Sequence, residues 1–597
     1  MMKPLLQSAG LGTLLLAGCV MPPDLVKRPE FLPPPAVQKD NDLLATTPVD
    51  SEYLNLAAES PGKHRVALLE TGEDALLARI HLIRSARKSI DIQTFIYVYD
   101  ESGCWVFKEL LHAARRGVRV RLLVDHIISP GISPEEYAAL AAAHVNLEVR
   151  LFRPISRDAL FDSMDVTQSA LTRFSTMNYR MHNKVMMIDD SLAIIGGRNF
   201  QNAYYDRDPQ LSFRDRDVLV SGPSIPDVKA SFDLFWSHRD SIDVLRMDDL
   251  RRIAISGQGT FPEGVTSKLP QFFTSLDQSA SSPDLSVFNP ELKLSQVDRI
   301  TFITDEPIKT SRLKNPLKKN PFAIIYSLFE NAEKEILIQT PYSVIGDKTY
   351  KTLRKIRKEK PELRMCMSTN SLASADHFFV GSIALKQRRF QIEGLKLELY
   401  LAKPVPGDIR EFVPRYDKLL EEAGALQEDE WLINTNLFGS GVKEGRFCVH
   451  GKSMVVDRKI SFVGSHNFDP RSVHLNSECM VMIEDEPFSS QLAKHIETAI
   501  KPQNSWVVAP RNLPPVVNEL NSLVSLISSN LPMFDIWILE DVSCFDLKDG
   551  STPLSPYDPD FYQSYIDVGP SPGLDLGLEQ VRVQLIRAFG GAAAPLM

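Results

Sequence analysis

One set of chemically useful residues occurs twice in this chain. In each copy, a histidine is followed by a lysine two positions later, an aspartate seven positions later and an asparagine seventeen positions later. A glycine-rich pair precedes the asparagine. The first copy comprises His182, Lys184, Asp189, Gly196, Gly197 and Asn199, and the second comprises His450, Lys452, Asp457, Gly464, Ser465 and Asn467. Because the internal spacing is the same, we interpret the copies as a duplicated site.

An imidazole, an ammonium group and an amide that converge twice on one point suit the chemistry of a phosphodiester. On a strand, the histidine and lysine of an H-x-K sequence point to the same face. The lysines and asparagines can neutralise the non-bridging oxygens as charge builds in the transition state. One histidine can attack phosphorus, while the other, protonated, can donate to the departing alkoxide. Water as the second acceptor gives hydrolysis, and an alcohol gives transfer.

Each histidine needs a carboxylate that fixes its tautomer. Glu478 directly precedes a strand-like run at 479–483, and we predict that it pairs with His450. Asp215 occupies the matching place in the first half and is the predicted partner of His182. Asp217 is the alternative partner of that histidine.

The other residues that recur at the same offset in both copies are expected to shape the backbone. Asp189 and Asp457 lie at an odd offset from their histidines, across the pleat or in the following turn, so we predict a structural role for them. The pairs Gly196-Gly197 and Gly464-Ser465 are predicted to let the backbone approach a ligand closely. No H-E-x-x-H sequence and no Cys/His cluster occurs, so neither a metal nor another cofactor is predicted.

Helix-period and strand-like segments alternate around these residues. Residues 75–86 and 106–116 have the pattern of helices, and residues 89–96 and 118–124 that of strands. Such alternation indicates an α/β sandwich. The sequence pattern A-x-K-x-I-x-I-Q-T also occurs twice, at 86–94 and 332–340, so the duplication extends beyond the polar residues.

Length and composition limit the function classes. The chain has 597 residues, 43% of them hydrophobic and 24% charged, which excludes wholesale disorder and leaves room for several domains. The formal net charge of −9 lacks the basic excess of a protein that binds nucleic acid over a broad surface. The predicted organisation is a signal peptide at 1–18, a Pro-rich tether at 19–62, α/β domains at 63–245 and 299–510, a linker or irregular insertion at 246–298, and a C-terminal extension at 511–597.

The first nineteen residues resemble a bacterial lipoprotein signal. Lys3 precedes a short apolar stretch that ends in Leu16-Ala17-Gly18-Cys19, and the stretch is too short to span a bilayer as a helix. Such a signal implies lipidation at Cys19, and several acyl chains give lasting attachment. Val20 stands where an inner-membrane retention signal typically places Asp. We therefore expect a cell-envelope protein anchored on the periplasmic side, in the outer rather than the inner membrane.

The duplicated residues resemble the signature of the phospholipase D superfamily, H-x-K-x₄-D followed by G-[GS]-x-N. The flanking sequences at 179–184, 195–200 and 464–478 resemble the bacterial cardiolipin synthase C-type branch. The resemblance implies two pseudo-symmetric α-β-α sandwich domains with mixed sheets around one shared cleft. It also implies metal-independent transfer through a phosphohistidine, with His182 as the nucleophile and His450 as the acid and base. Val185 and Gly197 depart from the small polar residues common at their positions.

The sequence leaves three candidate functions to be tested. The first is a phosphatidyltransferase, or a related phospholipase D, whose partners are the phospholipids of a bacterial membrane. The second is a metal-independent phosphodiesterase or nuclease, which the acidic net charge disfavours. The third is a catalytically silent lipid-binding scaffold, which the complete set of catalytic groups disfavours. Nucleic acid is not an expected partner, and the sequence identifies no protein partner.

Overall fold

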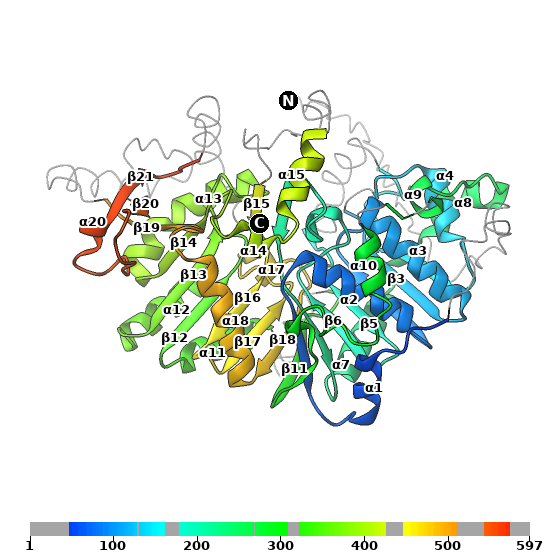
Figure 1. Cartoon of the computed structure of the whole chain (residues 1–597), viewed down its shortest axis with the longest axis horizontal. Helices are drawn as coiled ribbons and strands as arrows, with labels where there is room; N and C mark the ends of the chain where they lie inside the picture. Colours follow the sequence, from blue (N-terminus) through cyan, green and yellow to red (C-terminus); the bar gives the residue numbers. More distant parts are fainter. Residues whose placement is uncertain are drawn as a thin grey trace, which may run out of the picture.

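The computed structural model describes residues 47–127, 130–161, 178–267, 269–270, 273–308, 321–425, 446–511 and 542–573. The predicted signal peptide and Cys19 lie outside these ranges. Two large mixed sheets stand side by side, each with helices on its faces (Figure 1). The predicted α/β class, with two sandwich-like halves, is confirmed.

The first half contains a nine-stranded sheet. Strands β2, β3 and β4 are parallel to one another, and the other neighbours pair in antiparallel fashion. The order across the sheet is β10 (Ser295–Gln296), β1 (Arg65–Leu69), β8 (Asp217–Ser221), β6 (Leu192–Gly196), β5 (Val185–Ile188), β2 (Ser89–Thr94), β3 (Arg119–Asp125), β4 (Leu147–Phe152) and β9 (Ser241–Asp243).

The second half repeats this strand order and adds two strands from the C-terminal extension, β20 and β21. Its order is β11 (Arg299–Thr304), β18 (Cys479–Glu484), β17 (Ile460–Gly464), β16 (Ser453–Val456), β12 (Glu335–Gln339), β13 (Arg364–Asn370), β14 (Glu398–Ala402), β19 (Ser505–Pro510), β20 (Val542–Leu547) and β21 (Tyr565–Gly569). The series β1-β8-β6-β5-β2-β3-β4 therefore corresponds to β11-β18-β17-β16-β12-β13-β14, as a duplication requires.

The helices follow the same division. Those of the first half are α1 (Glu52–Glu59), α2 (Gly72–Ser85), α3 (Glu101–Arg115), α4 (Pro134–Ala141), α7 (Ile225–Trp236), α8 (Asp248–Ser256), α9 (Glu263–Thr266) and α10 (Thr274–Ser279). Those of the second half are α11 (Pro321–Asn331), α12 (Asp347–Glu359), α13 (Phe378–Arg389), α14 (Ile409–Phe412), α15 (Tyr416–Ala425), α17 (Pro470–His474), α18 (Glu486–Ala499) and α20 (Phe561–Ser564). No helix in the described ranges is both long and apolar enough to cross a bilayer.

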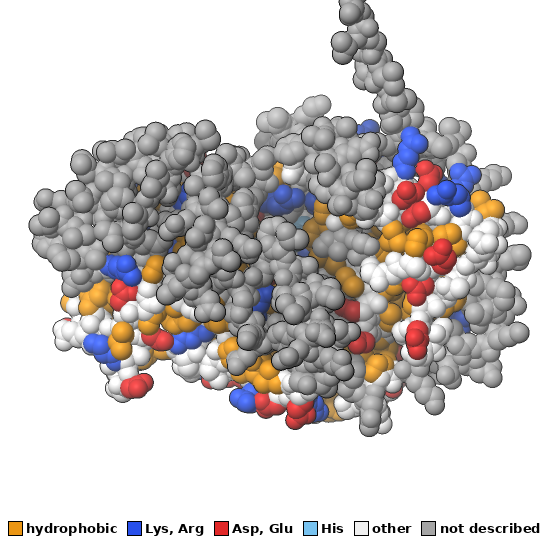
Figure 2. Space-filling model, turned by 90° about the horizontal axis from the view of Figure 1, so that it is seen from above, with side chains coloured by type: hydrophobic (Ala, Val, Ile, Leu, Met, Phe, Trp, Pro, Cys, Tyr) orange, Lys and Arg blue, Asp and Glu red, His pale blue; other side chains and the backbone are white. Residues whose placement is uncertain are grey.

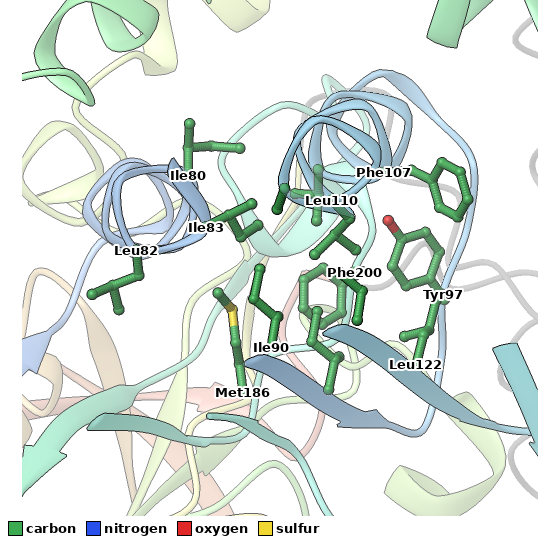
Figure 3. Packing of buried hydrophobic residues seen from close by; sticks show 14 of the residues in the cluster. Ile80, Leu82, Ile83, Ile90, Tyr97, Phe107, Leu110, Leu122, Met186 and Phe200 are labelled. Carbon is green, nitrogen blue, oxygen red and sulfur yellow. The ribbon is translucent and has the colours of Figure 1, made fainter. Parts of the chain in front are cut away.

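Apolar side chains hold the helices on the sheets and the sheets to each other. In the first half, Ile83 of α2 and Leu110 of α3 point toward Ile90 of β2, and all three are fully buried (Figure 3). A second apolar cluster contains residues of both sheets, among them Val185 of β5 and Val455 of β16. Because the strands next to the two H-x-K sequences share this cluster, the halves form a common core.

Two predicted segments differ from the structure. Residues 246–298 do not form a separate linker, because α8, α9 and α10 pack onto the first half and bury Leu250 and Val265 in its core (Figure 1). The predicted tether at 19–62 is wrong at its C-terminal end, where α1 buries Tyr53 and Ala57. In both segments a few well-spaced apolar residues outweigh a polar, Pro-rich composition.

Candidate active site

The two H-x-K sequences lie where the halves meet. His182 and Lys184 directly precede β5, and the main-chain N–H of His182 donates to the carbonyl of Ser477, 2.9 Å away in the opposite half. His450 and Lys452 lie between β15 (Arg446–Val449) and β16. Strand β15 pairs in parallel with β7 (Leu211–Arg214) of the first half, and the two form a separate small sheet. Each H-x-K sequence is therefore joined by hydrogen bonds to a segment of the opposite half, and that segment carries Glu478 in one case and Asp215 in the other.

The carboxylates pair with the histidines across the two halves. Nδ1 of His182 lies 2.8 Å from Oε2 of Glu478, and Nδ1 of His450 contacts Oδ2 of Asp215. The predicted pairs, Glu478 with His450 and Asp215 with His182, are therefore wrong. The alternative, Asp217, instead forms a buried ion pair with Arg79 at 2.9 Å. The prediction assigned each histidine a partner from its own half, but strand pairing at the boundary brings the partner from the other half.

Each carboxylate is held in place by further donors. The hydroxyl of Ser465 donates to Oε2 of Glu478 at 2.5 Å, and that of Ser472 donates to Oε1 at 2.8 Å. The main-chain N–H of Arg216 donates to Oδ1 of Asp215 at 2.7 Å. Burial alone would raise the pKa of Glu478, but the charges of His182 and nearby cations lower it to about 2. Since both carboxylates are ionised and immobile, they fix the ring orientation and leave Nε2 as the reactive nitrogen of each histidine.

Both imidazoles are uncharged at neutral pH. Burial lowers the pKa of His182 to about 4, with Lys184 acting in the same direction and Glu478 opposing it. Burial and the neighbouring Lys452 likewise lower the pKa of His450, against the effect of Asp215. Lys452 belongs to the second motif and yet also lowers the pKa of His182. The two motifs therefore share one electrostatic environment.

The two lysines lie against their own histidines. Nζ of Lys184 donates to the carbonyl of His182 at 2.8 Å, and Nζ of Lys452 lies 3.2 Å from Nε2 of His450. Burial lowers the pKa of Lys184 to about 7, with Lys452 contributing in the same direction. Burial also lowers the pKa of Lys452. A bound phosphodiester would offset this desolvation, because an anion favours the charged form of both amines.

The aspartates of the two motifs lie in turns. The carboxylate of Asp189 accepts the main-chain N–H groups of residues 87, 88 and 89 at 2.7–2.9 Å. Asp457 accepts those of residues 333, 334 and 335 at the same distances. Both aspartates have a φ of 52°. They tie the turn after the motif strand to the start of a neighbouring strand, which is the structural place that their odd offset predicted.

The motif glycines make room for neighbouring carboxylates and strands, while the close approach of a ligand that we expect at these positions stays a prediction. A Cβ on Gly197 would lie 2.1 Å from Oδ1 of Asp215, and one on Gly196 would lie 1.9 Å from Oδ1 of Asp217. A Cβ on Gly464 would lie 2.4 Å from the carbonyl oxygen of Cys479. These contacts are closer than any real Cβ tolerates, so the glycines let the carboxylate-bearing strand approach.

The two asparagines differ in their bonding. Nδ2 of Asn199 donates to the hydroxyl of Tyr204 at 2.8 Å, and its Oδ1 accepts the main-chain N–H of Ile96 at 3.1 Å. Oδ1 of Asn467 is buried and accepts no hydrogen bond from the residues that the structure describes. Nδ2 of Asn467 likewise donates to no described residue, so this N–H₂ group, and not the oxygen, is available as the predicted donor to a phosphate, whereas Nδ2 of Asn199 already donates to Tyr204.

Several residues of the site were missed by sequence reasoning. Phe95 places its ring edge-on to that of His182, with the centroids 4.9 Å apart, and Tyr204 contacts His450. Glu70 binds both Arg214 and Arg216, which flank Asp215. Arg216 then donates across the boundary to Gln339 at 2.9 Å and Ser453 at 2.6 Å. Of these, Phe95 alone carries a signal in the sequence, because it directly follows the repeated I-Q-T sequence.

The side chains at the boundary between the halves suit phosphoryl chemistry on an anionic ester. Two neutral imidazoles, two buried amines and one unoccupied amide lie at the boundary between the halves, near β15 and α17 in Figure 1. Figure 2 views the molecule from the top of Figure 1, and histidine, basic and hydrophobic side chains are visible together near the middle of that face. Charged and apolar side chains that lie together in this way suit a substrate with an ionised phosphate and an apolar body.

Comparison with known proteins agrees with this chemistry. A family model described as cardiolipin synthase, PLD-like domain, matches residues 79–216 and 325–500, more than half of the chain. An uncharacterised protein of Helicobacter pylori is 30% identical over 476 residues, 77% of this chain and 84% of that protein. Cardiolipin synthase C of Escherichia coli K12 is 28% identical over 450 residues, 74% of this chain and 86% of that protein. The crystal structure of phosphatidylserine synthase of Haemophilus influenzae Rd KW20 aligns with a TM-score of 0.45 at 12% identity, covering 80% of this chain and 98% of that one.

Proposed function

The chain belongs to the cardiolipin synthase, PLD-like domain family of the phospholipase D superfamily, and from that premise we propose a membrane-anchored phosphatidyltransferase that acts on glycerophospholipids. Transfer of a phosphatidyl group to an alcohol, as in cardiolipin synthesis, is the proposed main reaction, and hydrolysis of the phospholipase D type is the alternative outcome. The observation that carries the proposal is the crossed pairing of two neutral histidines with two carboxylates.

In the proposed first step, Nε2 of His182 attacks phosphorus and the bond to the head-group oxygen breaks. His450 donates its proton to that oxygen. In the free protein His450 is neutral, but the negative charge of a bound phosphodiester favours its protonated form. Lys184, Lys452 and Asn467 bind the non-bridging oxygens, whose charge grows in the transition state.

In the proposed second step, an alcohol or water replaces the histidine. Its proton passes to Nε2 of His450, a new P–O bond forms, and the P–N bond to His182 breaks. The order of the two histidines follows the family resemblance, while the need for both follows from the proton balance. Glu478 and Asp215 stabilise the cations that form on their histidines in turn.

The lipid products test the proposal. Purified protein is incubated with phosphatidylglycerol and phosphatidylethanolamine, and the products are identified by mass spectrometry. We expect phosphatidyl transfer products, or phosphatidic acid, from the parent protein and none from His182→Ala or His450→Ala. His144→Ala, at a histidine in the loop before β4, is the matched control and should remain active. Absence of any phosphatidyl product from the parent protein would contradict the proposal, and nicking of plasmid DNA without metal would favour the nuclease.

We also propose that Cys19 is lipidated and holds the protein on the periplasmic side of the cell envelope, in the outer membrane. The sequence Leu16-Ala17-Gly18-Cys19 supports this proposal. Labelling of cells with radioactive palmitate should mark the parent protein and not Cys19→Ser. Density separation of inner and outer membranes then locates the labelled protein, and recovery of the parent in the soluble fraction would contradict the anchor.

A further inference from the structure

Tyr204 connects the first motif to the histidine of the second. Nδ2 of Asn199 donates to the Tyr204 oxygen at 2.8 Å, and that oxygen lies 3.5 Å from Nε2 of His450. Because Asn199 supplies a hydrogen to the oxygen, the phenolic hydrogen is available to Nε2. Nδ1 of His450 is in turn bound to Asp215. A chain of hydrogen bonds thus runs from Asn199 through Tyr204 and His450 to Asp215.

The surroundings keep the phenol protonated and fixed. Tyr204 is 3% exposed, and its ring lies against that of Phe213 with centroids 4.6 Å apart. Its ring is also edge-on to that of His450, with the centroids 5.1 Å apart. Burial, reinforced by the charge of Asp215, raises the pKa of Tyr204 well above its ordinary value. The hydroxyl therefore keeps its hydrogen at neutral pH and acts as a donor.

The other histidine has no such neighbour. The aromatic ring beside His182 is that of Phe95, which has no hydroxyl. Nδ1 of His182 also contacts the carbonyl of Ser465 at 3.1 Å, and the structure records no side-chain donor at its Nε2 among the residues described. The duplicated site is thus asymmetric at the reactive nitrogens, where the two halves must do different work: one attacks phosphorus and the other exchanges a proton with an oxygen.

We propose that the Tyr204 hydroxyl binds the oxygen of the acceptor alcohol beside His450 and thereby favours transfer over hydrolysis. This inference rests on the proposed function. An alcohol oxygen placed there accepts the Tyr204 hydrogen, gives its own hydrogen to Nε2 and directs its carbon substituent outward. Water has a second hydrogen in the place of that carbon substituent, and this hydrogen has no partner in the Asn199–Tyr204–His450–Asp215 chain, whereas an alcohol satisfies both of its polar contacts within it.

The proton balance agrees with this arrangement. As the acceptor attacks, its hydrogen passes to Nε2 of His450, the new P–O bond forms and the P–N bond to His182 breaks. Once Nε2 carries a hydrogen, it no longer accepts from Tyr204. The phenol keeps its own hydrogen throughout and donates it to the acceptor oxygen, which it positions for attack on phosphorus.

Tyr204→Phe tests this role because it removes one oxygen and keeps the ring. With phosphatidylglycerol as donor and acceptor, we expect the rate of transfer to fall about tenfold and the ratio of transfer product to phosphatidic acid to fall at least about fivefold. Tyr205→Phe is the matched control: Tyr205 is buried next to Tyr204, and its hydroxyl has no hydrogen-bond partner among the described residues. We expect it to keep the rate and ratio of the parent.

A second variant separates the proposed role of Tyr204 from a loss of folding in Tyr204→Phe. Asn199→Leu keeps the branched shape of the side chain and releases the Tyr204 oxygen, so it should shift the product ratio in the same direction as Tyr204→Phe. A parent-like rate and ratio in Tyr204→Phe, or equal losses of transfer and hydrolysis, would overturn the inference while the proposed function stands. A parent protein that forms no phosphatidyl product would overturn both.

Discussion

Nδ1 of His182 lies 2.8 Å from Oε2 of Glu478, although the two residues are 296 positions apart and belong to different halves of the duplicated fold. The reciprocal pair, His450 with Asp215, crosses the same boundary. Neither motif histidine has its carboxylate in its own half. The two halves must therefore be docked before either imidazole is oriented, which explains why the sheets share an apolar core rather than a mobile hinge.

The crossed pairing predicts which imidazole responds to each carboxylate. In Glu478→Gln the pKa of His182 should fall further, because a favourable charge is lost, while His450 changes little. In Asp215→Asn the pKa of His450 should fall instead. NMR titration of the imidazole signals, assigned with His182→Ala and His450→Ala, measures both shifts. We also expect each variant to lose at least about 10²-fold in phosphatidyl transfer, by analogy with loss of the orienting carboxylate in a catalytic triad.

Asp217→Asn is the control for this experiment. Its carboxylate lies in the same segment as Asp215 but binds Arg79 and Arg198. The variant should lower thermal stability and leave both imidazole titrations unchanged. A change in the pKa of His182 in Asp215→Asn, with no change in Glu478→Gln, would show that the pairs form within each half.

Much of this arrangement was predictable from the sequence because it repeats. Helices expected at 75–86 and 106–116 occur at Gly72–Ser85 and Glu101–Arg115, and strands expected at 89–96 and 118–124 occur at Ser89–Thr94 and Arg119–Asp125. The period of apolar residues shows which face of a single helix or strand is buried, so these elements can be predicted from local sequence alone. The identical spacing of the two H-x-K sequences likewise identified the residues of the site.

The partners of these residues were not predictable in the same way. Spacing along the chain cannot show that β15 pairs with β7 of the other half, and this pairing brings Asp215 to His450. Nor does any period mark Tyr204, which reaches His450 through a turn at Asn202–Tyr204. Contacts across a boundary between domains depend on tertiary packing, and a single sequence contains no direct measure of it.

The protonation states predict an asymmetric dependence of activity on pH. The pKa of His182 is lowered to about 4, so the nucleophile stays unprotonated, and kcat/KM should fall only as pH drops toward that value. The pKa of Lys184 is lowered to about 7, so its ammonium form declines as pH rises above 7. We therefore expect kcat/KM to decrease on the alkaline side, because free His450 loses the proton that it must donate and because, above about pH 7, the Lys184 amine no longer neutralises the phosphodiester. Each of the two groups contributes up to a tenfold decrease per pH unit.

A short-chain soluble phosphatidylglycerol, whose phosphate remains ionised throughout, allows this measurement between pH 4 and 9. In kcat the decline should begin at higher pH, since bound substrate favours the ammonium form. Lys184→Arg keeps a cation at all these pH values, so its kcat/KM, although lower, should decline less steeply on the alkaline side, where only the His450 contribution remains. An alkaline decline of equal slope in Lys184→Arg would assign it to another group.

The buried carboxylate of Glu70 should be important for stability. It accepts hydrogen bonds from Arg214 at 3.0 Å and from Arg216 at 2.5–2.7 Å. Glu70→Gln leaves two buried guanidinium groups without their counter-charge, which costs about 3–5 kcal/mol in comparable buried pairs. We expect a matching decrease in the free energy of unfolding from urea titrations followed by circular dichroism. Asp417→Asn, in the exposed pair with Arg410, is the control and should leave the free energy of unfolding unchanged. Equal effects of the two variants would contradict a stabilising role for Glu70.

Substitutions at two glycines test how closely the segment that carries Asp215 must approach the first motif. A Cβ at Gly197 would lie 2.1 Å from Oδ1 and 2.7 Å from Cγ of Asp215, so Gly197→Ala must displace the carboxylate that orients His450. A displacement of about 1 Å can cost about 10²-fold in rate, and we expect a loss of that size in phosphatidyl transfer. A Cβ at Gly451 would meet nothing closer than Oε1 of Gln339 at 3.5 Å, an ordinary contact, so Gly451→Ala should keep the activity of the parent. If both variants retained activity, the position of Asp215 would not limit the reaction; if both lost it, the cause would be general disturbance of the site.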